Sequence, residues 1–221
     1  MKVDFILLGA GKAGTTTFVE ILKSHPEISF CKLKEPNFFS NAKEWKNNVT
    51  KYHALFKKKE GVIYGEASTS YSGYPEMDLG IWERIYDYNK NMKFIYIVRN
   101  PIHRAISQYM QCYQKGRINY SIEEAITKYP GLINPSRYYT QIMPYVKLFG
   151  EKQILILHFD DLVNCKERLL IDTANFLEID QKPFYSFINS NLHTNVSIHA
   201  NKLHYKYRKK IKKYDSILEP V

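Results

Sequence analysis

A glycine-bracketed loop near the start of the chain carries the residue types that bind phosphate groups. Residues 5 to 17 read FILLGAGKAGTTT, in which an apolar run leads through Gly9 and Gly14 into three threonines. A strand-to-helix loop of this kind points backbone N–H groups and a positive helix end at one place, where an anion is stabilised. The ATPase pattern needs a lysine directly after the second glycine, but Thr15 stands there and Lys12 lies inside the loop. We therefore expect a phosphate site that differs from an ATPase site, with an ordinary strand-to-helix turn as the alternative.

A second set of candidate anion ligands lies in residues 94 to 109, FIYIVRNPIHRAISQY. Arg99 comes at the carboxyl end of an apolar strand, which is where α/β folds place ligands. Arg104 and Ser107 are three residues apart on the following helix, so they share one helical face. We expect this face and Arg99 to converge on an anion. A solvated arginine and an ordinary helix serine are the alternative for these residues taken alone.

The elements that must position these side chains follow from the hydrophobic pattern. Short apolar runs predict strands, and segments with helical spacing predict helices between them. An asparagine followed by a proline at 100–101 marks a helix start, because these residues suit the N-cap and the first helical position. The predicted strands are 3–8, 61–64, 93–98 and 153–159; the predicted helices are 15–24, 78–89, 101–114, 137–149 and 166–177. This alternation predicts a single α/β domain over residues 1–221, with a central, mostly parallel sheet flanked by helices.

Composition narrows the class of protein further. The 221 residues are 44% hydrophobic and 14% aromatic, which is typical of a globular domain. The net charge is +10, and residues 200–221 contribute +5 of it (seven Lys/Arg against two Asp/Glu), so we expect anionic ligands. The three cysteines are widely spaced and form no C-x-x-C pair. We find no signal peptide and no apolar run long enough for a membrane span. These features predict reduced thiols and a cytoplasmic location.

Several segments together resemble one enzyme family. In order, they are GAGKAGTTT, KEPNFF, GEASTSY, VRNPIHRAISQY, SRYYTQIMPYVKLFG and QILILHFDDL. Over residues 3 to about 177 the chain resembles the sulfotransferases that use 3′-phosphoadenosine 5′-phosphosulfate (PAPS) and release 3′-phosphoadenosine 5′-phosphate (PAP). The resemblance implies a P-loop-like sulfotransferase fold and no requirement for a metal. It assigns Lys12 to the region between phosphate and sulfonate, and cofactor binding to Gly11, Lys12, Ala13, Gly14, Thr15, Thr16, Thr17, Arg99 and Ser107, the last two at the 3′-phosphate.

The acceptor side is also assigned by resemblance. GEASTSY is similar to the E-K-[TS]-x-x-Y segment of the glycan sulfotransferases, which makes Glu66 the general base and, with Lys12, a catalytic residue. A surface carboxylate is the alternative. Ala67 stands where those enzymes have lysine, and Lys34 is a candidate substitute. Further candidates for the acceptor cleft are Glu35, Phe38 and Tyr71. The acceptor is predicted to be a hydroxyl-bearing molecule, with a glycan, a glycolipid or another alcohol all compatible.

The basic tail and two rival functions stay open. Residues 203–215, LHYKYRKKIKKYD, fit a solvated cationic helix, an edge of the cofactor site, or a patch that contacts an anionic membrane or nucleic acid. We prefer the helix and expect no nucleic-acid partner. A P-loop kinase would share the loop but needs the lysine after Gly14, and a nucleic-acid binder gives no reason for the Glu66 segment. The sequence predicts no particular oligomeric state.

Overall fold

The computed structural model describes residues 1–40, 44–77 and 80–188. Its centre is a five-stranded sheet in the order β2-β3-β1-β4-β5, with every paired strand parallel. The strands are β1 (Phe5–Gly9), β2 (Ile28–Phe30), β3 (Ile63–Ala67), β4 (Lys93–Val98) and β5 (Ile154–His158). This arrangement confirms the predicted parallel α/β fold. The predicted basic tail, 200–221, lies outside the described residues.

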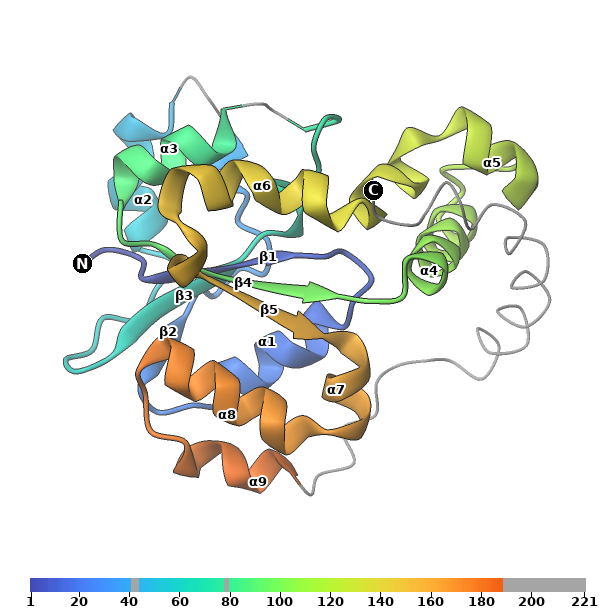
Figure 1. Ribbon diagram of the computed structural model, residues 1–221. Helices are drawn as coiled ribbons and strands as arrows, with labels where there is room; N and C mark the ends of the chain where they lie inside the picture. The colour runs from blue at the N-terminus through green and yellow to red at the C-terminus, as the bar shows by residue number, and fades with distance from the viewer. Residues whose placement is uncertain (41–43, 78–79, 189–221) are drawn as a thin grey trace.

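Helices cover both faces of the sheet (Figure 1). One face carries α2 (Val49–His53), α3 (Ile81–Tyr88) and α6 (Tyr138–Phe149), and the other carries α1 (Thr15–Lys23), α8 (Lys166–Leu177) and α9 (Tyr185–Ile188). A short helix, α7 (Phe159–Asn164), follows β5 directly. Because both faces are covered, all five residues of β1 are buried, as a central parallel strand requires.

Most predicted elements are present, and the differences have physical causes. The helix at 101–114 and the strand at 93–98 are confirmed as α4 (Pro101–Gln114) and β4, and the Asn100 side chain accepts a hydrogen bond from the N–H of His103. The strand predicted at 153–159 is present as β5, but it is an edge strand and its Ile156 is 43% exposed. The strand predicted at 61–64 lies instead at 63–67, because its pairing with β1 aligns Phe5 with Gly65. Glu66 is therefore inside the strand.

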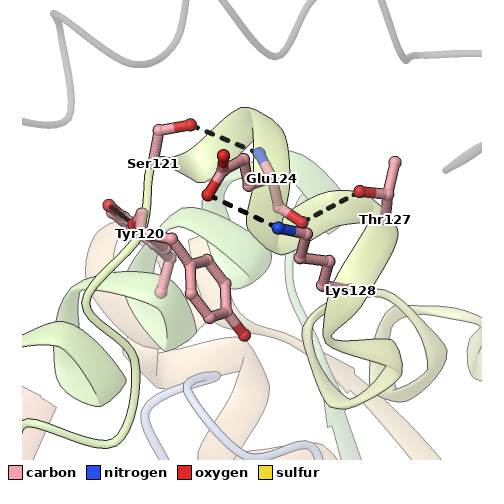
Figure 2. A network of polar contacts seen from close by, with 6 residues as sticks. Tyr120, Ser121, Glu124, Thr127 and Lys128 are labelled. Atoms are coloured by element: carbon pink, nitrogen blue, oxygen red, sulfur yellow. Dashed lines mark hydrogen bonds and ion pairs between the residues drawn. The ribbon is translucent and has the colours of Figure 1, made fainter.

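Residues after α4 form short helices beside α4, at one end of the molecule (Figure 1). One of these helices, α5 (Ile122–Lys128), begins at Ser121, whose hydroxyl accepts a hydrogen bond from the N–H of Glu124 (Figure 2). Glu124 also lies 3.9 Å from Lys128, one helical turn on. Apolar residues of α4 and α5 build a small core of their own. The residues between α4 and α6 thus form a packed unit with α4, and the Gln141 side chain of α6 also donates to the carbonyl of Asn134 at 2.9 Å.

Candidate active site

The phosphate loop lies between β1 and α1, at the carboxyl edge of the sheet. Gly14 is the N-cap of α1 with a φ of 80°, so the helix starts without a side-chain cap. Within the described residues, no protein acceptor is found for the backbone N–H groups of Gly11, Lys12, Gly14, Thr15, Thr16 and Thr17. Unpaired N–H groups at the first turn of a helix form an anion site. The predicted cofactor loop therefore has the donors that a phosphate needs.

Gly14 is required by packing as well as by backbone conformation. A Cβ at this position would come within 2.9 Å of the Phe159 ring and 3.0 Å of the Leu162 side chain, both on α7. Its φ also lies in the left-handed region, which L side chains rarely adopt. The loop thus packs closely against α7 at Gly14.

Lys12 has cationic neighbours and no acidic partner. The residue is half-buried, and in the described part of the chain its ammonium group makes no ion pair. Burial lowers the pKa of Lys12, and the nearby charges of Arg99, Lys115 and Arg104 lower it further. An ammonium among like charges favours a bound anion as its partner. That Lys12 faces a phosphate or sulfonate stays a prediction, which its cationic surroundings favour.

Arg99 is held at the same edge of the sheet. Its Nη1 donates to the carbonyl oxygen of Lys12 at 2.9 Å, and its guanidinium lies 4.3 Å from the centre of the Phe159 ring. The Tyr138 hydroxyl fixes the backbone of Arg99, since it donates to the carbonyl at 2.7 Å and accepts from the N–H at 3.3 Å. Arg99 Nε is buried and has no partner among the described residues, so the guanidinium retains donor capacity for a ligand.

Arg104 does not face this anion site, which corrects the predicted convergence. Its side chain is 1% exposed, with Nε bonded to the Ser136 hydroxyl and Nη2 to the carbonyl of Leu132. Burial lowers its pKa to about 10. Arg104 therefore ties the segment after α5 to α4, a contact that helical spacing alone does not reveal. Ser107 lies half-buried on α4, and its hydroxyl has no partner among the described residues.

Lys34 and Glu35 bring the loop after β2 to the phosphate loop. Lys34 Nζ donates to the Thr16 hydroxyl at 2.6 Å, so a second ammonium reaches the start of α1. The half-buried Glu35 accepts a 2.9 Å hydrogen bond from the Thr69 hydroxyl, and Thr69 Oγ1 would lie 3.8 Å from a Cβ at Gly11. The site thus combines a cationic phosphate loop with a carboxylate on its acceptor side.

Glu66 is fully buried next to the loop after β2 and does not line a cleft. It is 0% exposed, and three hydroxyl groups donate to its carboxylate: Tyr52 at 3.0 Å, Tyr71 at 3.2 Å and Ser68 at 2.7 Å. Burial raises its pKa to about 7, although the three hydrogen bonds act in the opposite direction. The predicted position of Glu66 at a cleft is therefore wrong, because the strand continues through it.

The aromatic candidates for the acceptor cleft are largely used in packing. Tyr71 is 2% exposed and its hydroxyl is engaged by Glu66 and by the N–H of Phe39, so the prediction that it lines the cleft is wrong. Phe38 is half-buried and stacks on Tyr52 with ring centres 4.1 Å apart. No role was predicted for Thr69, Tyr138 and Phe159, which contact site residues. The one available signal was proximity: Phe159 ends the predicted strand 153–159, and Thr69 lies in the GEASTSY segment that contains Glu66.

Together, a phosphate loop, an arginine at the end of the neighbouring strand and a nearby carboxylate define a parallel α/β domain built for group transfer from a phosphorylated donor. Residues 2–213 match the family model described as "Sulfotransferase domain". The chain therefore belongs to this sulfotransferase family, as the resemblance implied.

Known relatives agree with this assignment. The chain is 30% identical over 176 residues to mouse heparan sulfate glucosamine 3-O-sulfotransferase 5. The aligned region covers 72% of this chain and 48% of the mouse protein. It thus spans about half the length of that protein. A sulfotransferase from Alicyclobacillus acidocaldarius has the same fold, with a TM-score of 0.73, 23% identity and coverage of 100% and 97% of the two chains. A mouse sulfotransferase complexed with PAP has a TM-score of 0.51, 16% identity and coverage of 86% and 65%.

The described residues also bear on membrane and metal binding. No helix among residues 1–40, 44–77 and 80–188 has the length and apolar character to cross a membrane. In the same ranges, no group of three or more His, Cys, Asp or Glu side chains could hold a metal ion. The cytoplasmic location and the absence of a metal requirement stay predictions.

Proposed function

We propose that this chain transfers a sulfuryl group from PAPS to a hydroxyl group of a sulfated, glucosamine-containing glycan, with Glu35 as general base. Membership of the sulfotransferase family supports the reaction class, and the name of the mouse relative supports the acceptor class. The net charge of +10 favours an acidic acceptor. The observation that carries the proposal is the Thr69 hydroxyl, which bonds to the Glu35 carboxylate beside Gly11 of the phosphate loop.

The residues of the loop fit the donor. Unpaired N–H groups at the start of α1, the threonine hydroxyls and Lys34 would hold the 5′-phosphosulfate, and Arg99 with Ser107 would hold the 3′-phosphate. PAPS supplies a sulfuryl group on a phosphate leaving group. Lys12 then stabilises the electron pair that the breaking S–O bond leaves on the phosphate oxygen, because a fixed ammonium interacts most strongly where charge develops.

Glu35 is a better candidate for the base than Glu66. A general base must come within hydrogen-bond reach of the proton that it removes. Glu35 is half-buried with one hydroxyl donor, whereas Glu66 is 0% exposed and accepts from three hydroxyl groups. In this proposal Glu35 takes the proton of the acceptor hydroxyl while the new S–O bond forms.

Nucleotide preference tests the donor. PAP should raise the melting temperature of the protein without a divalent ion, by more than ADP or ATP with Mg²⁺ does, because only PAP has a 3′-phosphate for Arg99. Equal stabilisation by ADP and PAP would remove the 3′-phosphate site from the proposal. Stabilisation by ATP only with Mg²⁺ would favour a kinase instead.

Transfer of labelled sulfate from PAPS to heparan sulfate oligosaccharides tests the acceptor and the base. Glu35→Gln should lower kcat by about 10²- to 10⁴-fold, the range typical of a lost general base, while the Kd of PAP stays within about twofold. Glu20→Gln on the exposed side of α1 is the matched control and should keep wild-type turnover. Wild-type kcat in Glu35→Gln would eliminate Glu35 as the base.

A further inference from the structure

The buried carboxylate of Glu66 lies under a loop whose backbone is strained. Residues 35–39, which we call the base loop, follow β2 and contain two non-glycine residues with positive φ, Glu35 at 64° and Asn37 at 50°. Such conformations are costly for L residues and persist only where the surroundings enforce them. The loop therefore needs external contacts to keep its shape.

Those contacts come from the end of β3 and the turn after it. The N–H of Glu35 donates to the carbonyl of Ala67 at 2.9 Å. The N–H of Asn37 donates to the Ser68 hydroxyl at 3.1 Å, and the N–H of Phe39 donates to the Tyr71 hydroxyl at 3.0 Å. Alternate residues of the base loop are thus fixed by one short segment.

Glu66 orients the hydroxyl groups that accept two of these hydrogen bonds. A carboxylate only accepts, and a hydroxyl group has a single proton to donate. Ser68 and Tyr71 both donate that proton to Glu66, so each O–H is oriented toward the carboxylate while its oxygen accepts a backbone N–H of the base loop. Each hydroxyl is therefore a relay between the buried carboxylate and one N–H of the base loop.

We propose that Glu66 is a positioning residue, which fixes the base loop, and with it the Glu35 carboxylate, through the Ser68 and Tyr71 hydroxyl relays. This inference rests on the proposed role of Glu35. Glu66 itself does not contact the acceptor, since it has no exposed surface. Positioning matters for rate because a displacement of about 1 Å of a catalytic group can cost about a hundredfold.

The chain offers a matched control in Tyr52. Its hydroxyl also donates to Glu66, at 3.0 Å, but its contacts with the base loop are ring contacts, including the stack on Phe38. Tyr52→Phe keeps that ring and removes one hydrogen-bond donor to Glu66, while the Ser68 and Tyr71 hydroxyl groups stay in place. Tyr71→Phe and Ser68→Ala each remove one donor together with one relay.

Amide hydrogen exchange tests the relays without any acceptor. Tyr71→Phe should speed exchange at the Phe39 amide by tenfold or more, and Ser68→Ala should do the same at the Asn37 amide, whereas Tyr52→Phe should leave both unchanged. Unchanged exchange in Tyr71→Phe and Ser68→Ala, or equal acceleration in Tyr52→Phe, would overturn the proposal.

Turnover distinguishes this inference from the proposed function. With labelled PAPS and heparan sulfate oligosaccharides, Tyr71→Phe and Ser68→Ala should lower kcat about tenfold or more with the Kd of PAP unchanged, and Tyr52→Phe should stay within about twofold of wild type. If the exchange pattern appears but Glu35→Gln keeps full activity, the relays stand and the base assignment fails. If kcat is unaffected by loss of both relays, Glu66 is not a positioning residue.

Discussion

Replacing Lys12 by alanine probes the transition state directly. Lys12 is half-buried, its pKa is lowered by burial and by Arg99, and no acidic residue in the described chain neutralises it. At an effective dielectric constant of about 20, a unit charge at about 4 Å is worth roughly 4 kcal/mol. Only part of a charge develops on the leaving oxygen, so we expect a loss of about 3 to 4 kcal/mol. This corresponds to a decrease in kcat of about 10²- to 10³-fold.

The assay must separate turnover from binding. Initial rates of labelled sulfate transfer at saturating PAPS give kcat, and calorimetry gives the Kd of PAP. We expect the Kd to rise by less than tenfold, because the N–H groups at the start of α1 and Arg99 still hold the phosphates. Lys23→Met, at the other end of α1, is the control for general charge removal. Loss of PAP affinity equal to the loss of kcat would refute the reasoning, because Lys12 would then bind the ground state as strongly as the transition state.

Three further predictions concern stability. The raised pKa of Glu66 means that the folded state binds this proton more tightly than the unfolded state does. The free energy of unfolding should therefore fall as pH rises from about 4.5 to 7. Glu66→Gln should remove up to about 3 kcal/mol of this pH dependence, measured by urea titrations at pH 5 and pH 8. Gly14→Ala should cost at least about 1 kcal/mol and abolish stabilisation by PAP in thermal melts, because the new methyl group meets Phe159. Arg104→Met should lower the free energy of unfolding by about 2 kcal/mol or more, since the Ser136 contact is lost. Reduced PAP affinity at wild-type stability would instead restore Arg104 to the anion site.

The parts of the site that depend on local chain geometry could be predicted from the sequence. The phosphate loop needs only a buried strand, its glycines and the start of a helix, and the structure places all three at residues 5–17. Arg99 was also predictable, because it comes at the end of an apolar strand, and parallel strands present their carboxyl ends at one edge. In both cases the residues that define the feature are adjacent in the chain.

The parts that failed depend on contacts between distant segments. Arg104 has the right helical spacing for an anion ligand, yet its partners are Ser136 and Leu132, about 30 residues further on. Glu66 was misplaced because the register between β3 and β1 moved the end of the strand. Glu66 thus lies within the strand instead of after its end, and residues 65–67 are all buried, so both faces of β3 are covered at this point.

The two carboxylates illustrate how one sequence motif can mislead about chemistry. Glu66 lies in the segment that resembles the family pattern, but three hydroxyl donors and complete burial leave it no route to a substrate. Glu35 has a single hydroxyl donor, lies beside the phosphate loop, and is close enough that its charge helps to raise the pKa of Glu66. A buried acceptor of fixed position is suited to hold a strained loop, and a half-exposed carboxylate on that loop is suited to take a proton. The geometry therefore favours dividing positioning and proton transfer between the two residues, which a variant series on the relays can separate.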